Sequence, residues 1–222
     1  MNDNAFDDQY EGCTEEMESK IINSLLAEEK RADSVFNRTW DEAKKKWDTE
    51  KPSVPDGFRD EYGIAIMAYS NKSSDLYSSF NRAVRDYSSR DTFHYHSLHF
   101  FITRAVVLLR STCSHSVYRG IKNIRFKNET NVGKVRFGQF ASSSTNHTVA
   151  KNFGDDTFFN ITSCFGADIK KYSYYPKQEE VLIPVDEVFE VTKVIEQDGK
   201  GRFVLKTTNR CHYYNCDYLC NG

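Results

Sequence analysis

The sequence has 222 residues, of which 39% are hydrophobic and 14% aromatic, enough to build the core of one large or two small domains. Its 30 basic and 32 acidic residues are interspersed and leave a formal net charge of −2, so no basic stripe exists to bind a nucleic-acid backbone or an anionic membrane. No run of about 18 apolar residues occurs, which excludes a membrane-spanning helix from the expected structure.

The first half of the sequence has the apolar spacing of helices. In residues 14–50, Trp40, Ala43 and Trp47 recur at helical spacing, which predicts amphipathic helices. Two later segments, SSDLYSSFNRAVRDY and YHSLHFFITRAVVLLRS, again carry apolar residues on one helical face. We therefore expect residues 1–112 to be mainly helical.

Three histidines, His94, His96 and His99, fall close together at the start of the last of these helical segments. His96 and His99 would lie about one turn apart on a helix. A zinc site needs a further ligand and usually a carboxylate nearby, and this helix is filled with aromatic residues instead. We therefore expect no metal site.

After Cys113 the sequence changes to short runs of β-branched and aromatic residues separated by turn residues. The runs are SVYRG, IRFK, KVRFGQFASSS, TFFNITSC, ADIKKYSYY, EEVLIPV, VFEVTKVIE and RFVLKTT. Helices followed by strands indicate an α+β fold with antiparallel or mixed sheets, rather than alternating βαβ units. We predict a single domain over residues 1–222, mainly helical over 1–112 and mainly β over 113–222.

Cysteines and glycosylation triplets favour a secreted or surface-displayed protein. The six cysteines show no spacing typical of zinc, and their even number fits three disulfides, for which fifteen pairings are open. The Asn-x-Ser/Thr triplets begin at Asn37, Asn71, Asn128, Asn146 and Asn160, which are the glycosylation candidates.

Three polar residues arrive on separate predicted strands: Arg119 in VYRG, Ser142 in FGQFASSS and Glu180 in KQEEVLIP. Each one alone is typical of a solvated strand end. Together they have a chemical logic, because an arginine can clamp a pyrophosphate, a hydroxyl can orient a substrate and a carboxylate can stabilise a positively charged sugar. This set suits the cleavage of an N-glycosidic bond in a dinucleotide.

Five blocks, AFDDQYEGC, FNRAVRDY, HSVYRG, VRFGQFASSS and EEVLIP, resemble in this order the vertebrate ecto-ADP-ribosyltransferases. These are the extracellular members of the arginine-serine-glutamate class of toxin-like mono-ADP-ribosyltransferases, and the match extends from Ala5 to Cys220. The resemblance implies N-terminal helices packed around two facing β-sheets, with NAD+ as the substrate in the cleft between them. It also implies an extracellular protein that is secreted or held at the cell surface by a GPI anchor added to its precursor.

The resemblance also assigns roles to residues. Arg119 matches the arginine that contacts the NAD+ phosphates and the adjacent ribose, Ser142 matches the serine of the strand end, and Glu180 matches the catalytic glutamate. Gly120 would offer backbone groups to the nicotinamide amide, because a glycine lets the backbone approach closely. Phe153 resembles the aromatic residue in the loop over the nicotinamide. No metal is implied, and the partners are NAD+ and protein arginines or the chain itself.

Gln178 departs from the family pattern. Arginine-specific members carry Glu-x-Glu here, whereas this chain has Gln178-Glu179-Glu180. A guanidinium keeps its proton up to a pKa above about 12, so it needs a carboxylate that both holds it and accepts the proton. Strand alternation is expected to place Gln178 on the face of Glu180 and Glu179 on the other face.

The expected activity is therefore cleavage of NAD+ with transfer of ADP-ribose to water more than to protein arginine. The alternative is a catalytically silent surface recognition protein that keeps the fold. The resemblance pairs Cys13 with Cys216 and Cys113 with Cys164, which leaves Cys211 and Cys220 to pair with each other.

Overall fold

The computed structural model describes residues 4–110, 113, 115–124 and 133–220. The sequon at Asn128 and most of the predicted strand IRFK lie outside the described residues. None of the helices in the described ranges has the length and apolarity that a bilayer crossing needs.

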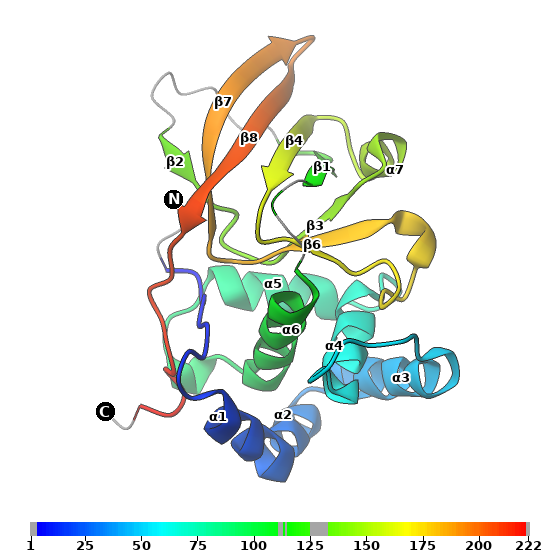
Figure 1. Ribbon diagram of the computed structural model, residues 1–222, viewed down its shortest axis with the longest axis vertical. Helices are drawn as coiled ribbons and strands as arrows, with labels where there is room; N and C mark the ends of the chain where they lie inside the picture. Colours follow the sequence, from blue (N-terminus) through cyan, green and yellow to red (C-terminus); the bar gives the residue numbers. More distant parts are fainter. Residues whose placement is uncertain (1–3, 111–112, 114, 125–132, 221–222) are drawn as a thin grey trace.

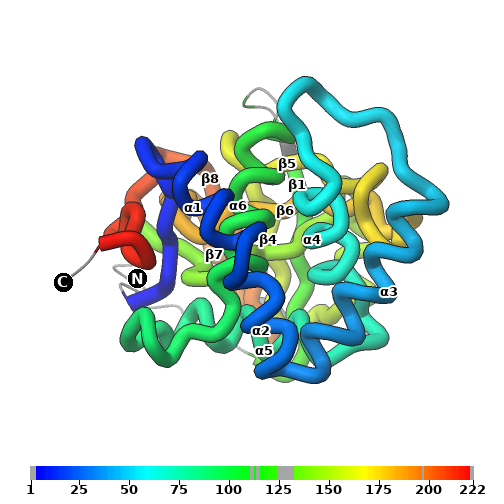
Figure 2. The backbone as a smooth tube through the Cα atoms, turned by 90° about the horizontal axis from the view of Figure 1, so that it is seen from below, coloured from blue at the N-terminus to red at the C-terminus, as the bar shows by residue number. Residues whose placement is uncertain are grey.

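The N-terminal half forms a layer of helices that packs against one side of a β-sheet (Figures 1 and 2). Its helices are α1 (Thr14–Lys20), a π-helical stretch (Ile21–Leu25), α2 (Leu26–Ala32), α3 (Ser34–Glu50), α4 (Asp60–Ser70), α5 (Leu76–Arg85), a 3-10 turn (Arg90–Thr92) and α6 (His96–Leu109). The helical prediction for 14–50 is confirmed, and Trp40, Ala43 and Trp47 form the buried face of α3. Asp33 starts this helix, because its carboxylate accepts hydrogen bonds from the backbone of Val35 and Phe36.

Helix α4 was not predicted, because it has no polar face to give a periodic pattern. Every residue from Tyr62 to Ser70 is buried, so the helix runs through the centre of the layer. Gly63 allows the close approach of α3, since a Cβ atom there would lie 2.1 Å from the ring of Trp47.

Within the residues that the structure describes, the C-terminal half supplies eight strands, which confirms the α+β class. They are β1 (His115–Ile121), β2 (Lys134–Val135), β3 (Ala141–Ser144), β4 (Thr157–Ser163), β5 (Ala167–Asp168), β6 (Glu180–Ile183), β7 (Glu187–Gln197) and β8 (Lys200–Arg210). Their order is β2-β7-β8-β4-β1-β3-β6-β5, and the sheet is mixed because β4 and β8 are parallel.

The two sheets implied by the resemblance are joined into one continuous sheet. Strands β1 and β3 pair through Tyr118 and Ser144 alone, whereas β1 and β4 pair along seven positions. The narrow junction lets β3 and β6 turn away from the rest of the sheet (Figure 1), and β5 pairs with β6 on the far side. The surface near this junction is open to a ligand.

Two predicted strands are shorter than expected, and a second helix was not predicted. Gly138, with a φ of 66°, interrupts KVRFGQFASSS, so only its two ends are strands. In ADIKKYSYY the chain turns after Asp168, because the backbone of Tyr172 donates a hydrogen bond to Ile169. Helix α7 (His147–Asn152) follows β3 and is capped by Asn146.

The two ends of the chain are fastened together. The disulfides Cys13–Cys216 and Cys113–Cys164 are present, as the resemblance implied. Cys211 and Cys220 are free, so their expected pairing is wrong. The two residues are held in separate places: the Cys211 amide bonds to Asp186 O at the end of β8, and the Cys220 amide bonds to Cys216 O in the last turn.

Candidate active site

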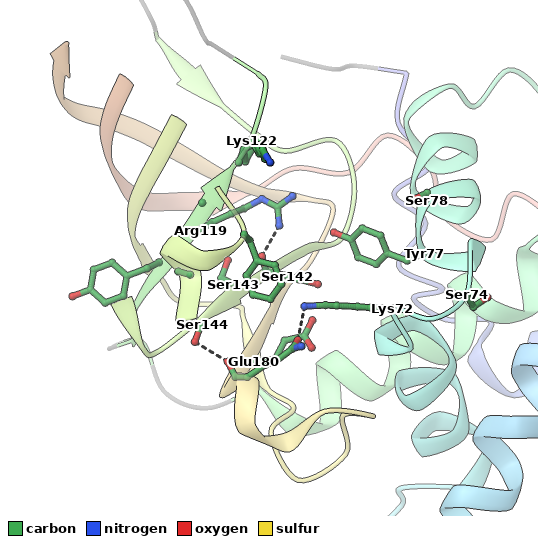
Figure 3. Close-up of a pocket in the computed structure, with 16 residues that line it drawn as sticks. Lys72, Ser74, Tyr77, Ser78, Arg119, Lys122, Ser142, Ser143, Ser144 and Glu180 are labelled. Carbon is green, nitrogen blue, oxygen red and sulfur yellow. Dashed lines mark hydrogen bonds between the residues drawn. The ribbon is translucent and has the colours of Figure 1, made fainter. Parts of the chain in front are cut away.

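A cavity of about 380 Å³ opens between the sheet junction and the helical layer (Figure 3). It gathers residues from the turn between α4 and α5, from β1, β3 and α7, and from the turn before β6. Every residue assigned to the active site by the resemblance lines it: Arg119, Gly120, Ser142, Phe153, Gln178 and Glu180.

Arg119 lies on β1 and points across the junction toward β3 (Figure 3). One terminal nitrogen of its guanidinium donates a 2.5 Å hydrogen bond to the backbone oxygen of Ser142. Its Nε is buried and has no hydrogen-bond partner among the described residues. A buried donor without an acceptor is unfavourable, so Arg119 retains hydrogen-bonding capacity for an anionic ligand.

Arg119 also marks the boundary between two cavities. A second cavity of about 760 Å³ shares Tyr77, Ser78, Arg119 and Ile121 with the first. Apolar residues of the sheet form much of its wall. The two cavities together offer an elongated space with a guanidinium at its middle.

Glu180 is the first residue of β6, and it is only 3% exposed. Its Oε2 accepts a 3.2 Å hydrogen bond from the Ser173 hydroxyl. Burial raises the pKa of Glu180 above its usual value, against the opposing effects of a Ser142 hydrogen bond, the Lys72 charge, the Ser173 hydrogen bond and the Arg119 charge. The Ser142 hydroxyl thus faces the carboxylate, as expected for a side chain directed into the cleft.

Gln178 lines the cavity with Glu180 and Glu179 does not, as expected, but strand alternation is not the cause. Gln178 ends a 3-10 turn (Pro176–Gln178), and Glu179 has a left-handed φ of 47°, so the strand begins only at Glu180. The left-handed residue, rather than strand alternation, turns the Glu179 carboxylate away. That carboxylate lies near Asn146 at 3.4 Å and Lys170 at 3.9 Å, outside the cavity.

Ser144 fixes the backbone of this turn. Its hydroxyl donates a 2.7 Å hydrogen bond to Gln178 O and accepts one from the Asn146 amide. Ser142 was predicted from the sequence, whereas Ser144 and Ser173 were not. The run of three serines was the only signal for Ser144, and nothing local distinguished Ser173.

Gly120 is required by packing as well as by any ligand. A Cβ atom there would lie 2.4 Å from Ala150 O and 2.2 Å from Gly154 O, so a larger residue would displace α7 and the loop after it. This loop carries Phe153, which is 45% exposed and lines the cavity.

Lys72 is a further cavity residue that the sequence analysis missed, because SNKSSD has the composition of an ordinary polar turn. Its Nζ lies 2.5 Å from Gln178 Oε1 and 3.5 Å from the centroid of the Phe153 ring. Burial of the ammonium lowers the pKa of Lys72 to about 8; the nearby Glu180 opposes this shift and Arg119 adds to it.

The histidines lie outside the cavity. His99 is fully buried in the helical core, where its ring nitrogens contact the Tyr10 hydroxyl at 2.8 Å and Phe6 O at 3.0 Å. Burial lowers the pKa of His96 to about 4 and that of His99 to about 3. The described residues contain no group of three or more metal-binding side chains.

Four of the five sequons lie in the described residues. Asn37 and Asn160 are exposed, and Asn146 is engaged as the cap of α7. Asn71 is only 1% exposed, and its side chain bonds to Ser73 and Glu42. Asn71 is therefore a poor glycosylation site in the folded protein, contrary to the expectation.

Known proteins resemble this chain along nearly all of its length. Residues 1–212 match the family profile described as NAD:arginine ADP-ribosyltransferase. The chain is 45% identical over 226 residues to T-cell ecto-ADP-ribosyltransferase 1 of Rattus norvegicus, covering 99% of this chain and 79% of the relative. It is 38% identical over 234 residues to GPI-linked NAD(P)(+)--arginine ADP-ribosyltransferase 1 of Mus musculus, covering 97% and 71%.

The same similarity appears in three dimensions. The crystal structure of the eucaryotic mono-ADP-ribosyltransferase ART2.2 superposes with a TM-score of 0.87 at 44% identity, covering 98% of this chain and 97% of that one. A mutant of that protein in complex with NAD gives the same TM-score at 42% identity.

Proposed function

The chain belongs to the family of NAD:arginine ADP-ribosyltransferases, and we propose that within this family it acts mainly as an extracellular NAD+ hydrolase, with protein arginine as a minor acceptor. The observation that carries the proposal is the environment of Glu180. This buried carboxylate shares a cavity with Arg119 and Ser142, while the neighbouring acceptor position holds the neutral Gln178.

The positions of Arg119 and the two cavities suit a dinucleotide. A diphosphate bound to the guanidinium would leave one nucleoside for each cavity. The nicotinamide ribose would then belong to the cavity that contains Glu180, Ser142 and Phe153. Phe153 also lines this cavity, so its aromatic ring would lie beside the nicotinamide ring.

The reaction breaks the bond between C1 of this ribose and the pyridinium nitrogen. The bonding electrons go to nicotinamide, which leaves as a neutral molecule, and positive charge develops on the ribose. The Glu180 carboxylate, which is itself almost fully buried, stabilises this oxocarbenium-like sugar at close range. Water then attacks C1 and releases a proton, which gives ADP-ribose, nicotinamide and H+.

Gln178 favours water over arginine as the acceptor. Its amide offers no negative charge to dock a guanidinium and cannot accept the guanidinium proton. Glu179 does not replace the missing carboxylate, because its side chain lies outside the cavity. Water needs neither a docking carboxylate nor a group that removes a guanidinium proton. Cleavage of NAD+ is therefore retained, and water replaces arginine as the main acceptor.

The test is chromatographic analysis of the products after incubation with NAD+, with and without the guanidino compound agmatine. Equal amounts of nicotinamide and ADP-ribose are expected, with little change on adding agmatine and with about 10²- to 10³-fold slower product formation by Glu180→Gln. A dominant agmatine adduct would show instead an ordinary arginine transferase. No release of nicotinamide would support a catalytically silent surface protein.

A further inference from the structure

Lys72 is a charged residue of the cavity that has no part in the chemistry described above. We propose that Lys72 is a second acceptor-selecting residue, whose ammonium occupies the acceptor position beside Gln178 and excludes cationic acceptors from it. This inference rests on the proposed hydrolase function and explains how that function is enforced. It predicts that Gln178 alone does not account for the preference for water.

The ammonium of Lys72 lies at the acceptor side of the cavity. Lys72 extends from the helical side of the cavity toward the sheet, and its Nζ ends beside Gln178 and Glu180 (Figure 3). The 2.5 Å contact to Gln178 Oε1 and the 3.5 Å approach to the Phe153 ring fix it on two sides. A guanidinium that approached Gln178 would meet this charge first.

The turn that carries Lys72 is held in place by hydrogen bonds. The buried Asn71 side chain accepts a 3.1 Å hydrogen bond from the Ser73 amide, which shapes the turn. The Ser73 hydroxyl lies 3.0 Å from the hydroxyl of Tyr175, the residue directly before the 3-10 turn that ends at Gln178. One contact therefore links the backbone segments of Lys72 and Gln178, so the two side chains are positioned together.

The hydrogen-bond donors of Lys72 and Gln178 also disfavour a guanidinium at this position. An ammonium and a guanidinium both have only donors, whereas an amide has one oxygen acceptor and an NH2 donor. Lys72 binds the amide oxygen of Gln178, so the other end of this amide is a donor group. An arriving guanidinium would thus face donors and a like charge, an arrangement that rejects a ligand by repulsion. Water is uncharged and can both donate and accept.

Lys72 is protonated in most molecules at neutral pH. Burial lowers its pKa to about 8, while Glu180 attracts the ammonium and opposes this shift and Arg119 repels it and adds to the shift. A carboxylate introduced at position 178 would pair with this ammonium instead of docking an acceptor. Gln178→Glu alone should therefore gain only part of the arginine transferase activity.

The experiment compares four proteins: the wild type, Gln178→Glu, Lys72→Met and the double variant. Nicotinamide release measures NAD+ cleavage, and the agmatine adduct measures transfer to a cationic acceptor. We expect the KM for agmatine to be about tenfold lower in the double variant than in Gln178→Glu, because one like charge has been removed from the site. Methanol serves as a neutral acceptor, and its share of the products should not respond to the charge at position 72.

Two control variants separate charge from shape and from position. Lys72→Arg combined with Gln178→Glu keeps the positive charge and should behave like Gln178→Glu alone. Lys177→Met combined with Gln178→Glu removes an exposed lysine that adjoins position 178 but does not line the cavity, so it too should leave agmatine transfer at the single-variant level. Lys72→Gln replaces Lys72→Met if the latter does not fold.

The outcomes distinguish the two proposals. If Gln178→Glu and the double variant transfer ADP-ribose to agmatine equally well, the role of Lys72 is overturned and the hydrolase function is left intact. A dominant agmatine adduct from the wild type would overturn the hydrolase function itself. An equal gain for agmatine and methanol in the double variant would show that Lys72 limits access to the cavity by its size, and would also overturn exclusion by charge.

Discussion

The helical layer and the cavity at the sheet junction each bury a glutamate, and the two glutamates differ in what surrounds them. Glu29 is 6% exposed, and its oxygens accept hydrogen bonds of 2.6 and 2.9 Å from the backbone of His96 and Ser97 at the start of α6. Glu180 is 3% exposed but faces a cavity that also contains Lys72 and Arg119. The first glutamate caps a helix, and the second is available to a ligand.

This difference shows that burial and a shifted pKa do not identify an active site by themselves. Burial raises the pKa of Glu29 to about 7 and also raises that of Glu180. The two glutamates differ in their hydrogen bonding. Backbone amides of the protein bond to both oxygens of Glu29, whereas the groups around Glu180 can still form hydrogen bonds to a ligand, as the unpaired Nε of Arg119 shows. Paired substitutions in the two regions test this interpretation.

The largest effect is expected from Glu180→Gln. Removing the anion that stabilises the charged ribose should lower the kcat of nicotinamide release by about 10²- to 10³-fold. The matched variant, Glu29→Gln, should lower the free energy of unfolding by about 1–3 kcal/mol, because it weakens the cap of α6. Its kcat per folded molecule should be unchanged. Steady-state kinetics and urea unfolding check both, and a kinetic loss in Glu29→Gln would break the comparison.

Arg119→Lys should have the next largest effect. A lysine keeps the charge but loses the planar donors that suit a diphosphate and also the bond to Ser142 O. We expect kcat/KM for NAD+ to fall by about 10²-fold, with most of the loss in substrate positioning. Unchanged kinetics would contradict the placement of the diphosphate at this residue.

Substitutions of two tightly packed glycines, one in each region, compare how packing affects stability and substrate binding. Gly120→Ala places a methyl group against Ala150 O and Gly154 O, and Gly63→Ala places one against the Trp47 ring. Each should cost about 1–3 kcal/mol of unfolding free energy through overpacking. Only Gly120→Ala should also raise the KM for NAD+, since it moves the loop that carries Phe153. Equal KM values for both variants would argue against that coupling.

The smallest effect concerns acid sensitivity in the helical core. The pKa of His99 is lowered from its usual 6.5 to about 3, so its stabilising effect is present above pH 6.5 and is lost as the pH falls toward 3. His99→Gln should therefore lose roughly 2 kcal/mol less stability than the wild type between pH 7 and pH 5. Urea unfolding at the two pH values measures this difference, and equal losses would contradict the buried neutral state of His99.

Much of the fold could be predicted because it follows from local periodicity. Apolar residues recur at helical spacing along the face of α3 that contains Trp40 and Trp47. In most strands of the C-terminal half, β-branched and aromatic residues form short runs bounded by turn residues. Helix α4 escaped prediction because it is apolar on all sides. The sheet junction at Tyr118 and Ser144 also escaped, because strand pairing depends on residues distant in sequence.

The sequence by itself determined the fold class, two disulfides and the set of Arg119, Ser142 and Glu180, because ordered blocks of residues carry them. Only the tertiary structure decided how the acceptor side of the cavity is built. Glu179 is turned away by one left-handed residue conformation, and Lys72 meets Gln178 across 106 positions of sequence. Such contacts leave no local pattern, because their geometry exists only after the helices have packed against the sheet.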